Sequence, residues 1–362
     1  MGDTQKITIR QVYVMFILAT LSPVVRLFPT ICSRYGGTAG WLAPVVGAVV
    51  PGIIITVLYA IFKNGRVRGL GEAFEVAFGK WPAKLLLIIY IAWTGILFLL
   101  YVRYYAERLT SSLFTSSGPD FFIIAMLLLV FYAARAKITA LARFSEISIL
   151  VFAVVFAVFF VSLLPTWKVQ NVMPVTYHDA LPVLRSAYPV VGIWGFITLF
   201  FFLDGHIENM GDIKKHARSM ILIIGGTTAL MMFMVVGSLG PDMAARMPLP
   251  FFKVSKLIDI MQSFDRFEAV LSSMLVIADF ILITVFVFVI SSLVKKLFGL
   301  SESRYLAGPV VMLGYAGSLL ISSSAYELER FSANPLTHAV NLTFCLVIPV
   351  LALAAGKVRR LF

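Results

Sequence analysis

The chain has 362 residues, of which 60% are apolar and only 13% are charged, and its mean hydropathy is +0.94. A soluble core has no place for this much apolar surface, so the composition excludes a soluble globular protein and predicts a polytopic membrane protein. The formal net charge of +12 does not indicate binding to nucleic acid, because the basic residues are dispersed over short loops instead of gathered on one face.

Ten apolar stretches follow one another along the chain, each close to the ~20 residues that a helix needs to cross a bilayer. The expected spans are 11–33, 40–62, 84–105, 120–134, 146–164, 187–204, 219–239, 269–293, 305–324 and 336–356. The sequence therefore predicts an all-α membrane protein with ten transmembrane helices in a single integral membrane domain, residues 1–362.

Positive charge alternates along the gaps between these spans. The two terminal segments and every second gap hold 19 of the 30 Lys and Arg residues, and the other gaps hold 9. Cytoplasmic loops carry the excess of Lys and Arg, so both termini are expected in the cytoplasm. The apolar run after Lys6 and Arg10 is longer than a signal-peptide core and lacks a convincing cleavage site, so we expect it to be retained as the first span.

The spans divide into two groups of five, over residues 1–165 and 180–362. Because five is odd, two five-helix units in series must lie upside down relative to each other, which predicts an inverted repeat. Binding sites in inverted-repeat folds lie where matching helices are broken. The first helix of each half contains helix breakers, which are Pro23 and Pro29 in span 1 and Pro189, Gly192 and Gly195 in span 6.

These breaks predict a binding site between spans 1 and 6. Broken helices offer backbone amides and small residues to a ligand, and Arg26 lies between the two prolines of span 1. The candidate ligand-binding residues are Pro23, Arg26, Pro29, Gly192, Trp194 and Gly195.

Asp279 is the deepest charged residue in any span, and a charge at such depth costs several kcal/mol unless it is paired. One interpretation gives it a role in binding a ligand, an ion or a proton, and the other makes it a structural carboxylate held by hydroxyls or an arginine. Arg26 is a candidate partner, although its guanidinium equally suits the carboxylate of a small ligand. Arg103 is expected to reach toward the outer interface among neighbouring tyrosines.

No catalytic or metal site is expected. Cys32 and Cys345 lie inside apolar spans without metal-ligand spacing, which predicts buried thiols. The histidines lie in loops or at span ends and form no catalytic or metal constellation in the membrane; they are His178, His206, His216 and His338. The sequence therefore argues against an enzyme and against a bound cofactor.

Two segments outside the spans are expected to form short amphipathic helices. Val254, Leu257, Ile258 and Met261 have the spacing of one apolar helix face on the external side, where such a helix would cover the site. The segment from Leu70 to Phe78 repeats the pattern on the cytoplasmic side.

The ten-span pattern and two segments resemble the spore germination permease family, the B subunits of nutrient germinant receptors in endospore-forming bacteria. The segments are GLGEAFEVAFGKWPAKLLLIIYIAW before and in span 3, and MPLPFFKVSKLIDIMQSFDRFEAV before span 8. The resemblance covers essentially the whole chain. Two features do not match a family motif, namely the charged exit of span 6, LDGHIENMGDIKKH, and the charges Arg26 and Asp279.

This resemblance implies a place among the amino acid–polyamine–organocation transporters, with a LeuT-like five-plus-five fold whose helices 1 and 6 are unwound. It also implies the inner spore membrane, contact with membrane lipid, an A subunit and a lipoprotein C subunit as partners, and a small germinant such as an amino acid or a sugar. The alternative is a proton- or ion-coupled transporter of small molecules that uses Asp279 as its titrating group.

Overall fold

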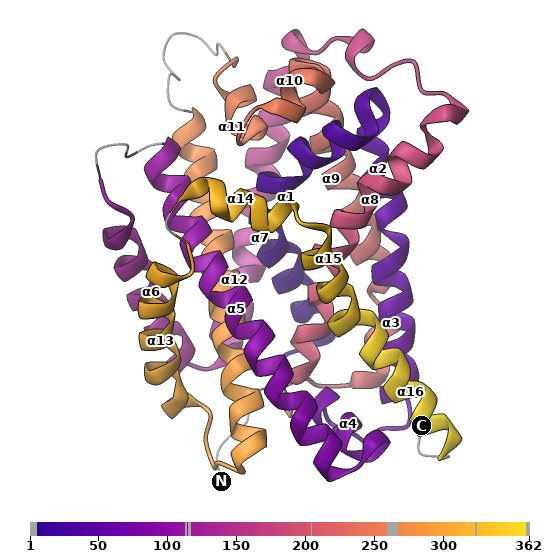
Figure 1. Cartoon of the computed structure of the whole chain (residues 1–362), viewed down its shortest axis with the longest axis vertical. Helices are drawn as coiled ribbons and strands as arrows, with labels where there is room; N and C mark the ends of the chain where they lie inside the picture. The colour runs from indigo at the N-terminus through magenta and orange to yellow at the C-terminus, as the bar shows by residue number, and fades with distance from the viewer. Residues whose placement is uncertain are drawn as a thin grey trace.

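A computed structural model describes residues 6–112, 114, 117–203, 205–258, 267–322 and 324–359. Nearly all of these residues lie in helices, and the one strand-like contact recorded among them is a bridge between Ile7 and Ile207. The all-helical architecture predicted from the sequence is therefore confirmed. Both ends of the chain lie at the same end of the molecule, at the bottom of Figure 1.

The α-helices are α1 (Ile9–Gly36), α2 (Ala43–Gly47), α3 (Val49–Phe62), α4 (Leu70–Phe78), α5 (Lys80–Ser112), α6 (Pro119–Arg135), α7 (Ile138–Leu163), α8 (Ala180–Trp194), α9 (Ala217–Leu239), α10 (Pro241–Arg246), α11 (Pro250–Ser255), α12 (Phe267–Phe298), α13 (Ala307–Leu320), α14 (Ala325–Ala333), α15 (Pro335–Leu342) and α16 (Ile348–Val358). Short 3₁₀ turns lie at Gly37–Leu42, Leu164–Thr166, Val169–Asn171, Tyr177–Asp179, Gly195–Phe202 (η5), Met210–Lys214 and Arg304–Leu306, and a π-helical turn lies at Thr343–Val347.

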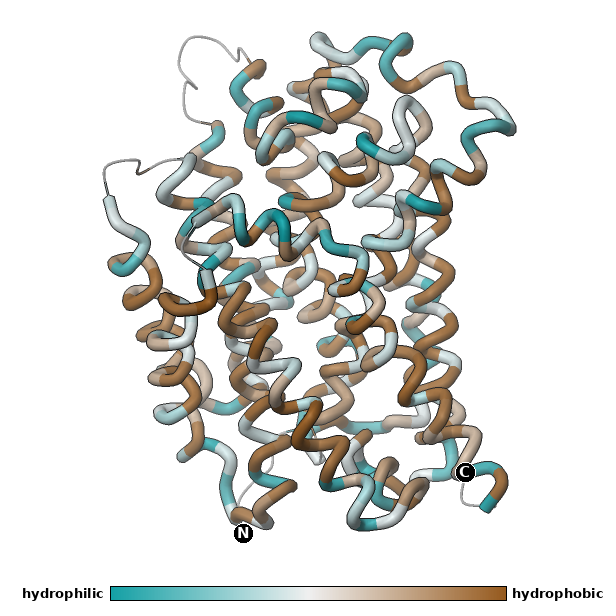
Figure 2. Tube along the Cα trace, viewed as in Figure 1, coloured by the Kyte–Doolittle hydropathy of each residue, from teal (hydrophilic) through white to brown (hydrophobic). Residues whose placement is uncertain are grey.

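Seven helical stretches in the described part of the chain are long and apolar enough to cross a membrane, or eight if the bent pair α13 and α14 forms one span. One stretch, Ile9–Phe62, contains the first two predicted spans, and α6 has only 17 residues. Each predicted span falls on a helical segment, and apolar residues dominate the long helices in Figure 2. That ten helices cross the membrane, in two inverted repeats, stays a prediction.

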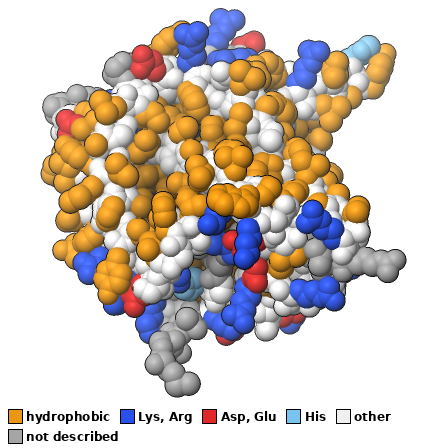
Figure 3. All heavy atoms as spheres, turned by 60° about the horizontal axis from the view of Figure 1, so that its bottom comes forward, with side chains coloured by type: hydrophobic (Ala, Val, Ile, Leu, Met, Phe, Trp, Pro, Cys, Tyr) orange, Lys and Arg blue, Asp and Glu red, His pale blue; other side chains and the backbone are white. Residues whose placement is uncertain are grey.

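The surface of α7 has the character of a lipid-facing helix. Ile147, Leu150, Val154, Val158 and Val161 follow helical spacing and are each about half to two-thirds exposed. Hydrophobic side chains cover much of the face in Figure 3, whereas Lys and Arg side chains gather at its top and across its lower half. A soluble protein rarely exposes so large an apolar surface, so the protein is an integral membrane protein.

Helix α1 lies at the centre of the fold and packs against α7, α8, α9, α10 and α12. It is helical without interruption through Pro23 and Pro29, so the expected unwinding of the first helix is not observed. Transmembrane helices tolerate proline where neighbouring elements surround them, and α1 is enclosed in this way.

The matching helix of the second half does change geometry. The α-helix α8 ends at Trp194, and the chain continues from Gly195 to Phe202 as the 3₁₀ helix η5, in which all eight residues are buried. A 3₁₀ run of this length is unusual and often marks a hinge or strain. The predicted irregularity of span 6 is therefore present, as a change of helix type.

At the end of the molecule that carries both termini, the N-terminal residues are tied to the rest of the fold. The Ile7 amide donates to the His206 carbonyl at 2.8 Å, and Arg10 pairs with Glu146 on α7 at 2.7 Å. Nearby, α4 buries Leu70 and Phe74 against α5, as the sequence predicts for an amphipathic helix. These contacts close this end around the start of α1.

At the opposite end, the connection between α7 and α8 docks onto the last turns of α9. The Trp167 indole donates to the Phe233 carbonyl at 3.3 Å, and the Asn171 amide donates to the Gly237 carbonyl at 2.7 Å. A Cβ atom added at Gly237 would overlap the Trp167 indole, whereas one at Gly226 on the same helix would meet open space.

This packing makes a stability prediction. Gly237→Ala should lower the free energy of unfolding by about 1–3 kcal/mol, because the indole must move out of its packed position. Gly226→Ala is the matched control and should be neutral, or stabilising by up to ~1 kcal/mol, because alanine favours the helix. Thermal unfolding of both variants in detergent measures the difference. Equal melting temperatures would contradict the docking of Trp167 on α9.

Candidate functional site

A large cavity lies in the half of the molecule away from the chain ends. Its volume is about 570 Å³, and it opens between α1, α5, α14 and the link from α10 to α11. The polar residues that line it are Arg26, Thr30, Arg34, Tyr104, Glu107, Arg108, Ser111, Arg246, Tyr326, Glu329 and Arg330. We call this space the outer cavity.

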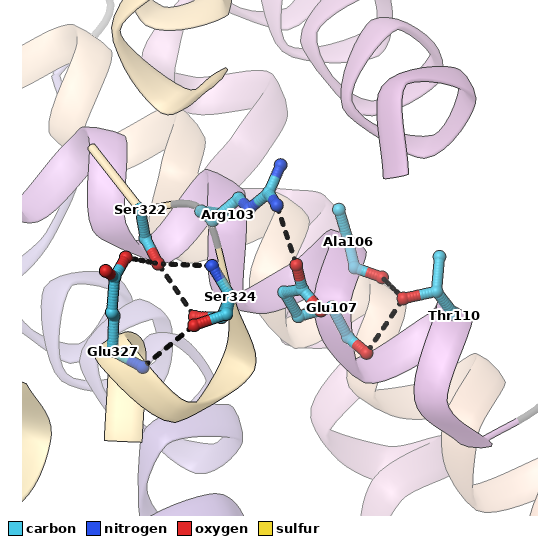
Figure 4. Close-up of polar contacts among 7 residues, drawn as sticks. All are labelled: Arg103, Ala106, Glu107, Thr110, Ser322, Ser324 and Glu327. Atoms are coloured by element: carbon cyan, nitrogen blue, oxygen red, sulfur yellow. Dashed lines mark hydrogen bonds and ion pairs between the residues drawn. The ribbon is translucent and has the colours of Figure 1, made fainter. Parts of the chain in front are cut away.

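Positive charge dominates the outer cavity. Five arginines line it against two glutamates. Arg108 is paired with Asp279 at 2.6 Å and Glu107 with Arg103 at 2.8 Å, which leaves four arginines against Glu329. Figure 4 shows the pair of Arg103 and Glu107 along α5. Like charges on the walls of a cleft raise the local concentration of the opposite charge. The outer cavity therefore favours an anionic group over a cationic one.

Arg103 differs from its expected position at an aqueous interface. Its side chain is 8% exposed and lies against Glu107 within the protein. Because α5 continues to Ser112, Arg103 is more than two turns inside the helix, where packing against other helices encloses it.

One wall of the outer cavity is α14, and its first turn is held by a serine network (Figure 4). The Ser322 Oγ accepts from the Ser324 amide at 3.2 Å and lies 3.3 Å from Glu327 Oε2. The Ser324 Oγ in turn accepts from the Glu327 amide at 3.4 Å, which caps the helix. This network fixes the position of the helix that carries Glu329 and Arg330.

The floor of the outer cavity is a cluster of Arg26, Tyr104 and Ser332. The Arg26 guanidinium lies 3.5 Å from the centre of the Tyr104 ring and donates to Ser332 Oγ at 3.3 Å. The Tyr104 hydroxyl donates to the Leu328 carbonyl at 2.8 Å and also contacts Ser332 Oγ. Stacking of a guanidinium on an aromatic face adds to these bonds. The cluster joins α1, α5 and α14.

Below this cluster lies a second, much smaller space of about 20 Å³, which we call the core pocket. It is lined by Arg26, Leu27, Leu97, Leu100, Tyr101, Tyr104, Ile193, Phe331, Ser332, Thr337, His338 and Asn341. Arg26, Leu27 and Tyr104 border both spaces, so they form the partition between the outer cavity and the core pocket. The core pocket is large enough for about one water molecule.

Asp279 on α12 is buried, and its partner is Arg108 on α5. Arg108 Nη2 lies 2.6 Å from Asp279 Oδ2, and both side chains are at most 3% exposed. The Ser22 side chain on α1 lies near the carboxylate. The ion pair between Arg26 and Asp279 that the sequence suggested is not formed, because Arg26 stacks on Tyr104 and Arg108 reaches the carboxylate instead.

Arg108 lies three residues beyond the predicted third span, 84–105. It lies inside α5, four residues after Tyr104 and seven after Tyr101, so the three side chains share one helix face. Extending the predicted third span past its last apolar residue would have placed all three on this face. Sequence reasoning missed Arg108 because it follows the predicted span, whereas Tyr101 and Tyr104 lie within it.

The other predicted ligand-binding residues are buried in the packing between helices. Pro23 and Pro29 are buried within the continuous α1. An added Cβ at Gly192 would meet His338 at 2.9 Å, and one at Gly195 would meet Cys345 at 2.8 Å. Because these two glycines have no Cβ, the His338 and Cys345 side chains can lie against their backbone. Trp194 is fully buried, and its ring packs against Phe28.

Three further sequence expectations concern the thiols, His338 and the external helix. Cys32 and Cys345 are free, buried thiols. His338, at the start of the last predicted span, is 3% exposed and borders the core pocket. The external helix predicted through Met261 is observed as α11, which ends at Ser255, and Met261 lies outside the described residues. The segment Met247–Leu249, which precedes α11, lines the outer cavity.

The ion pair generates a prediction. Arg108→Met or Asp279→Leu alone should each lower the free energy of unfolding by about 3–5 kcal/mol, because each leaves one buried charge without its partner. Combining both substitutions should recover most of that loss. Thermal unfolding of the two single variants and the double variant in detergent measures the coupling.

The control combination is Arg26→Met with Asp279→Leu. Its effects should simply add, because Arg26 contacts Tyr104 and Ser332 instead of the carboxylate. Recovery in this second pair, with simple addition in the first, would contradict the observed pairing.

Comparison with known proteins identifies the family. Residues 6–326 match the family described as "Spore germination protein". The spore germination protein YndE of Bacillus subtilis (strain 168) is 22% identical over 275 residues, which is 75% of each chain. YfkT of the same organism is 23% identical over 233 residues, or 63% of this chain and 62% of YfkT.

Among solved structures, the fold is similar to that of MHP1, a nucleobase-cation-symport-1 family transporter, in a closed conformation with bromovinylhydantoin bound. The TM-score is 0.69 at 10% identity, and the match covers 99% of this chain and 79% of MHP1. The helices thus have a transporter arrangement, and the sequence match extends over most of the chain. This protein belongs to the spore germination protein family.

Proposed function

We propose that this protein is the membrane-embedded B subunit of a nutrient germinant receptor and that it binds a small germinant in its transporter-like core. The family membership supports a role in spore germination, and the fold supports a small-molecule site between helices. The observation that carries the proposal is the arginine-rich outer cavity, separated from a polar core pocket by Arg26 on Tyr104.

The chemistry of the partition favours a germinant with a carboxylate, so an amino acid fits it better than a sugar. Arg26 offers a planar guanidinium that binds carboxylates through two parallel hydrogen bonds. Its present partners are an aromatic ring and a hydroxyl, both neutral, so a carboxylate competes well for it. Binding would then draw Arg26 away from Tyr104 and open the partition.

The topology fits a sensor in the inner spore membrane. With ten spans in a five-plus-five repeat and both termini in the cytoplasm, the outer cavity faces the side from which germinants arrive. Both chain ends lie at the end of the molecule opposite this cavity, which supports that orientation. The A subunit and the lipoprotein C subunit are the proposed partners that carry the signal onward.

The proposal predicts a graded loss of response at Arg26. Arg26→Gln should raise the germinant concentration needed for half-maximal response by roughly 10- to 100-fold, because a charged hydrogen bond is worth about 1.5–3 kcal/mol. The half-maximal concentration for Arg26→Lys should fall between those of the wild type and Arg26→Gln, since lysine keeps the charge without the planar guanidinium. Loss of optical density in spores exposed to each of the twenty L-amino acids measures the response.

Arg135→Gln is the matched control, because Arg135 is exposed at the end of α6 and lies outside both spaces. Immunoblots of spore membranes establish equal abundance of the variants. A response that Arg26→Gln leaves unchanged, or that sugars alone elicit, would contradict the assignment of Arg26 to a carboxylate.

The second candidate function is a proton- or ion-coupled transporter, and the buried pair of Asp279 and Arg108 favours it. The pair joins α5 to α12 beside α1, where a change of protonation would alter helix packing. In that case Asp279→Asn should uncouple uptake from pH while the solute still binds. Uptake of radiolabelled amino acid into proteoliposomes with and without a pH gradient separates a transporter from a sensor that only binds.

A further inference from the structure

His338 on α15 is a buried polar residue without a completed hydrogen bond. His338 is 3% exposed. Neither Nδ1 nor Nε2 has a hydrogen-bond partner of normal geometry among the described residues, although the Ser332 backbone lies close. Buried polar groups are nearly always paired, so an unpaired one needs a reason. An apolar side chain of similar size would fill this space without leaving two polar atoms unmet.

Packing holds the imidazole in this position. Gly192 on α8 lies directly against it, since a Cβ there would come within 2.9 Å of Nδ1. The Tyr188 ring approaches edge-on, with the ring centres 5.9 Å apart. The close approach that Gly192 permits thus positions a histidine whose nitrogens have no hydrogen-bond partner of normal geometry among the described residues.

The imidazole lies between two spaces. On one side it lines the core pocket with Arg26, and on the other it lines a cavity of about 260 Å³ with Arg34, Arg185 and Tyr188. Burial favours the neutral form of the ring, because a charged imidazolium would lose its hydration. A neutral imidazole has one acceptor nitrogen and one donor nitrogen.

The core pocket supplies few other acceptors. Asn341 Oδ1 already accepts from Trp93 Nε1 at 2.9 Å, and the Tyr104 hydroxyl donates to the Leu328 carbonyl. Ser332 Oγ is engaged by Arg26. Among the described residues that line the core pocket, His338 carries the buried polar atoms without a partner of normal geometry, so a ligand whose carboxylate binds Arg26 finds an uncommitted acceptor there.

We propose that His338 is a ligand-contacting residue that determines specificity, by accepting a hydrogen bond from the α-ammonium or α-hydroxyl group of a small carboxylate held by Arg26. The ligand class is then α-amino and α-hydroxy acids, and carboxylates that lack an α donor are rejected. The rejection follows because such a compound leaves the imidazole unpaired in a closed pocket. This inference rests on the proposed function and adds the residue that contacts the α substituent of the ligand.

The test uses the full chain in lipid nanodiscs. The probes are whichever of the twenty L-amino acids binds the wild type most tightly, its α-hydroxy analogue and its deamino analogue, all with the same carboxylate and side chain. Affinities come from isothermal calorimetry. The wild type should bind the first two compounds at least 10-fold more tightly than the deamino analogue.

His338→Leu should bring the three affinities to within about 3-fold of one another, because the variant has no acceptor to offer. His338→Gln keeps an amide acceptor and should restore part of the preference, and it serves as the folded alternative if the leucine variant does not fold. His178→Leu is the control, since His178 is exposed in the connection between α7 and α8.

The ratio of affinities separates specificity from structure. A purely structural role of His338 would lower all three affinities by the same factor, and that result would overturn the inference, as would a preference that His338→Leu leaves intact. In both cases the proposed function stands, because an amino acid still binds. Absence of binding of every L-amino acid to the wild type would overturn the inference together with the amino-acid assignment on which it rests.

Discussion

Every charge inside the helix bundle must find its partner within the protein, and α5 is the helix through which most of these partnerships run. Arg108 on α5 pairs with Asp279 on α12, Tyr104 stacks under Arg26 of α1, and Arg103 pairs with Glu107 one turn along α5 itself. Hydrocarbon offers no water to an unpaired ion, so these contacts restrict how α1, α12 and α14 can be arranged around α5. The outer cavity and its floor are the space that this arrangement leaves.

The small residues of the sixth span have a role in packing that bears directly on the site. Gly192 admits His338, and Gly195 admits Cys345, so α8 and η5 approach α15 and the π-helical turn closely. Thr198 on η5 reinforces the contact by donating to the Cys345 carbonyl at 2.6 Å. The glycines therefore act through a neighbouring helix: they bring His338 to the wall of the core pocket.

Side-chain contacts close the fold around α1 in two places. Arg26 and Tyr104 separate the outer cavity from the core pocket, and the N-terminal residues are tied to α7 and to the segment after η5 at the opposite end. The two closures differ in strength. The N-terminal salt bridge is exposed on the Arg10 side and contributes at most about 1 kcal/mol, whereas the cluster of Arg26, Tyr104 and Ser332 joins three helices by hydrogen bonds and a cation–π contact. A polar ligand that competes for Arg26 would weaken the partition between the outer cavity and the core pocket directly.

The sequence by itself determined the class of the protein, because apolar runs of membrane length and an alternating distribution of Lys and Arg depend on composition and period alone. It also indicated that Arg26, Asp279 and the glycines of span 6 lie at the centre of the fold. Their partners came only from the tertiary structure. Arg108 is 171 residues from Asp279, and Ser332 is 306 residues from Arg26, so no local spacing connects them. Likewise, proline in α1 predicts a break only for an isolated helix, and enclosure by five neighbouring helices kept α1 continuous. Helix period fixes which face a residue occupies, whereas the helix opposite that face is chosen by packing over the whole chain.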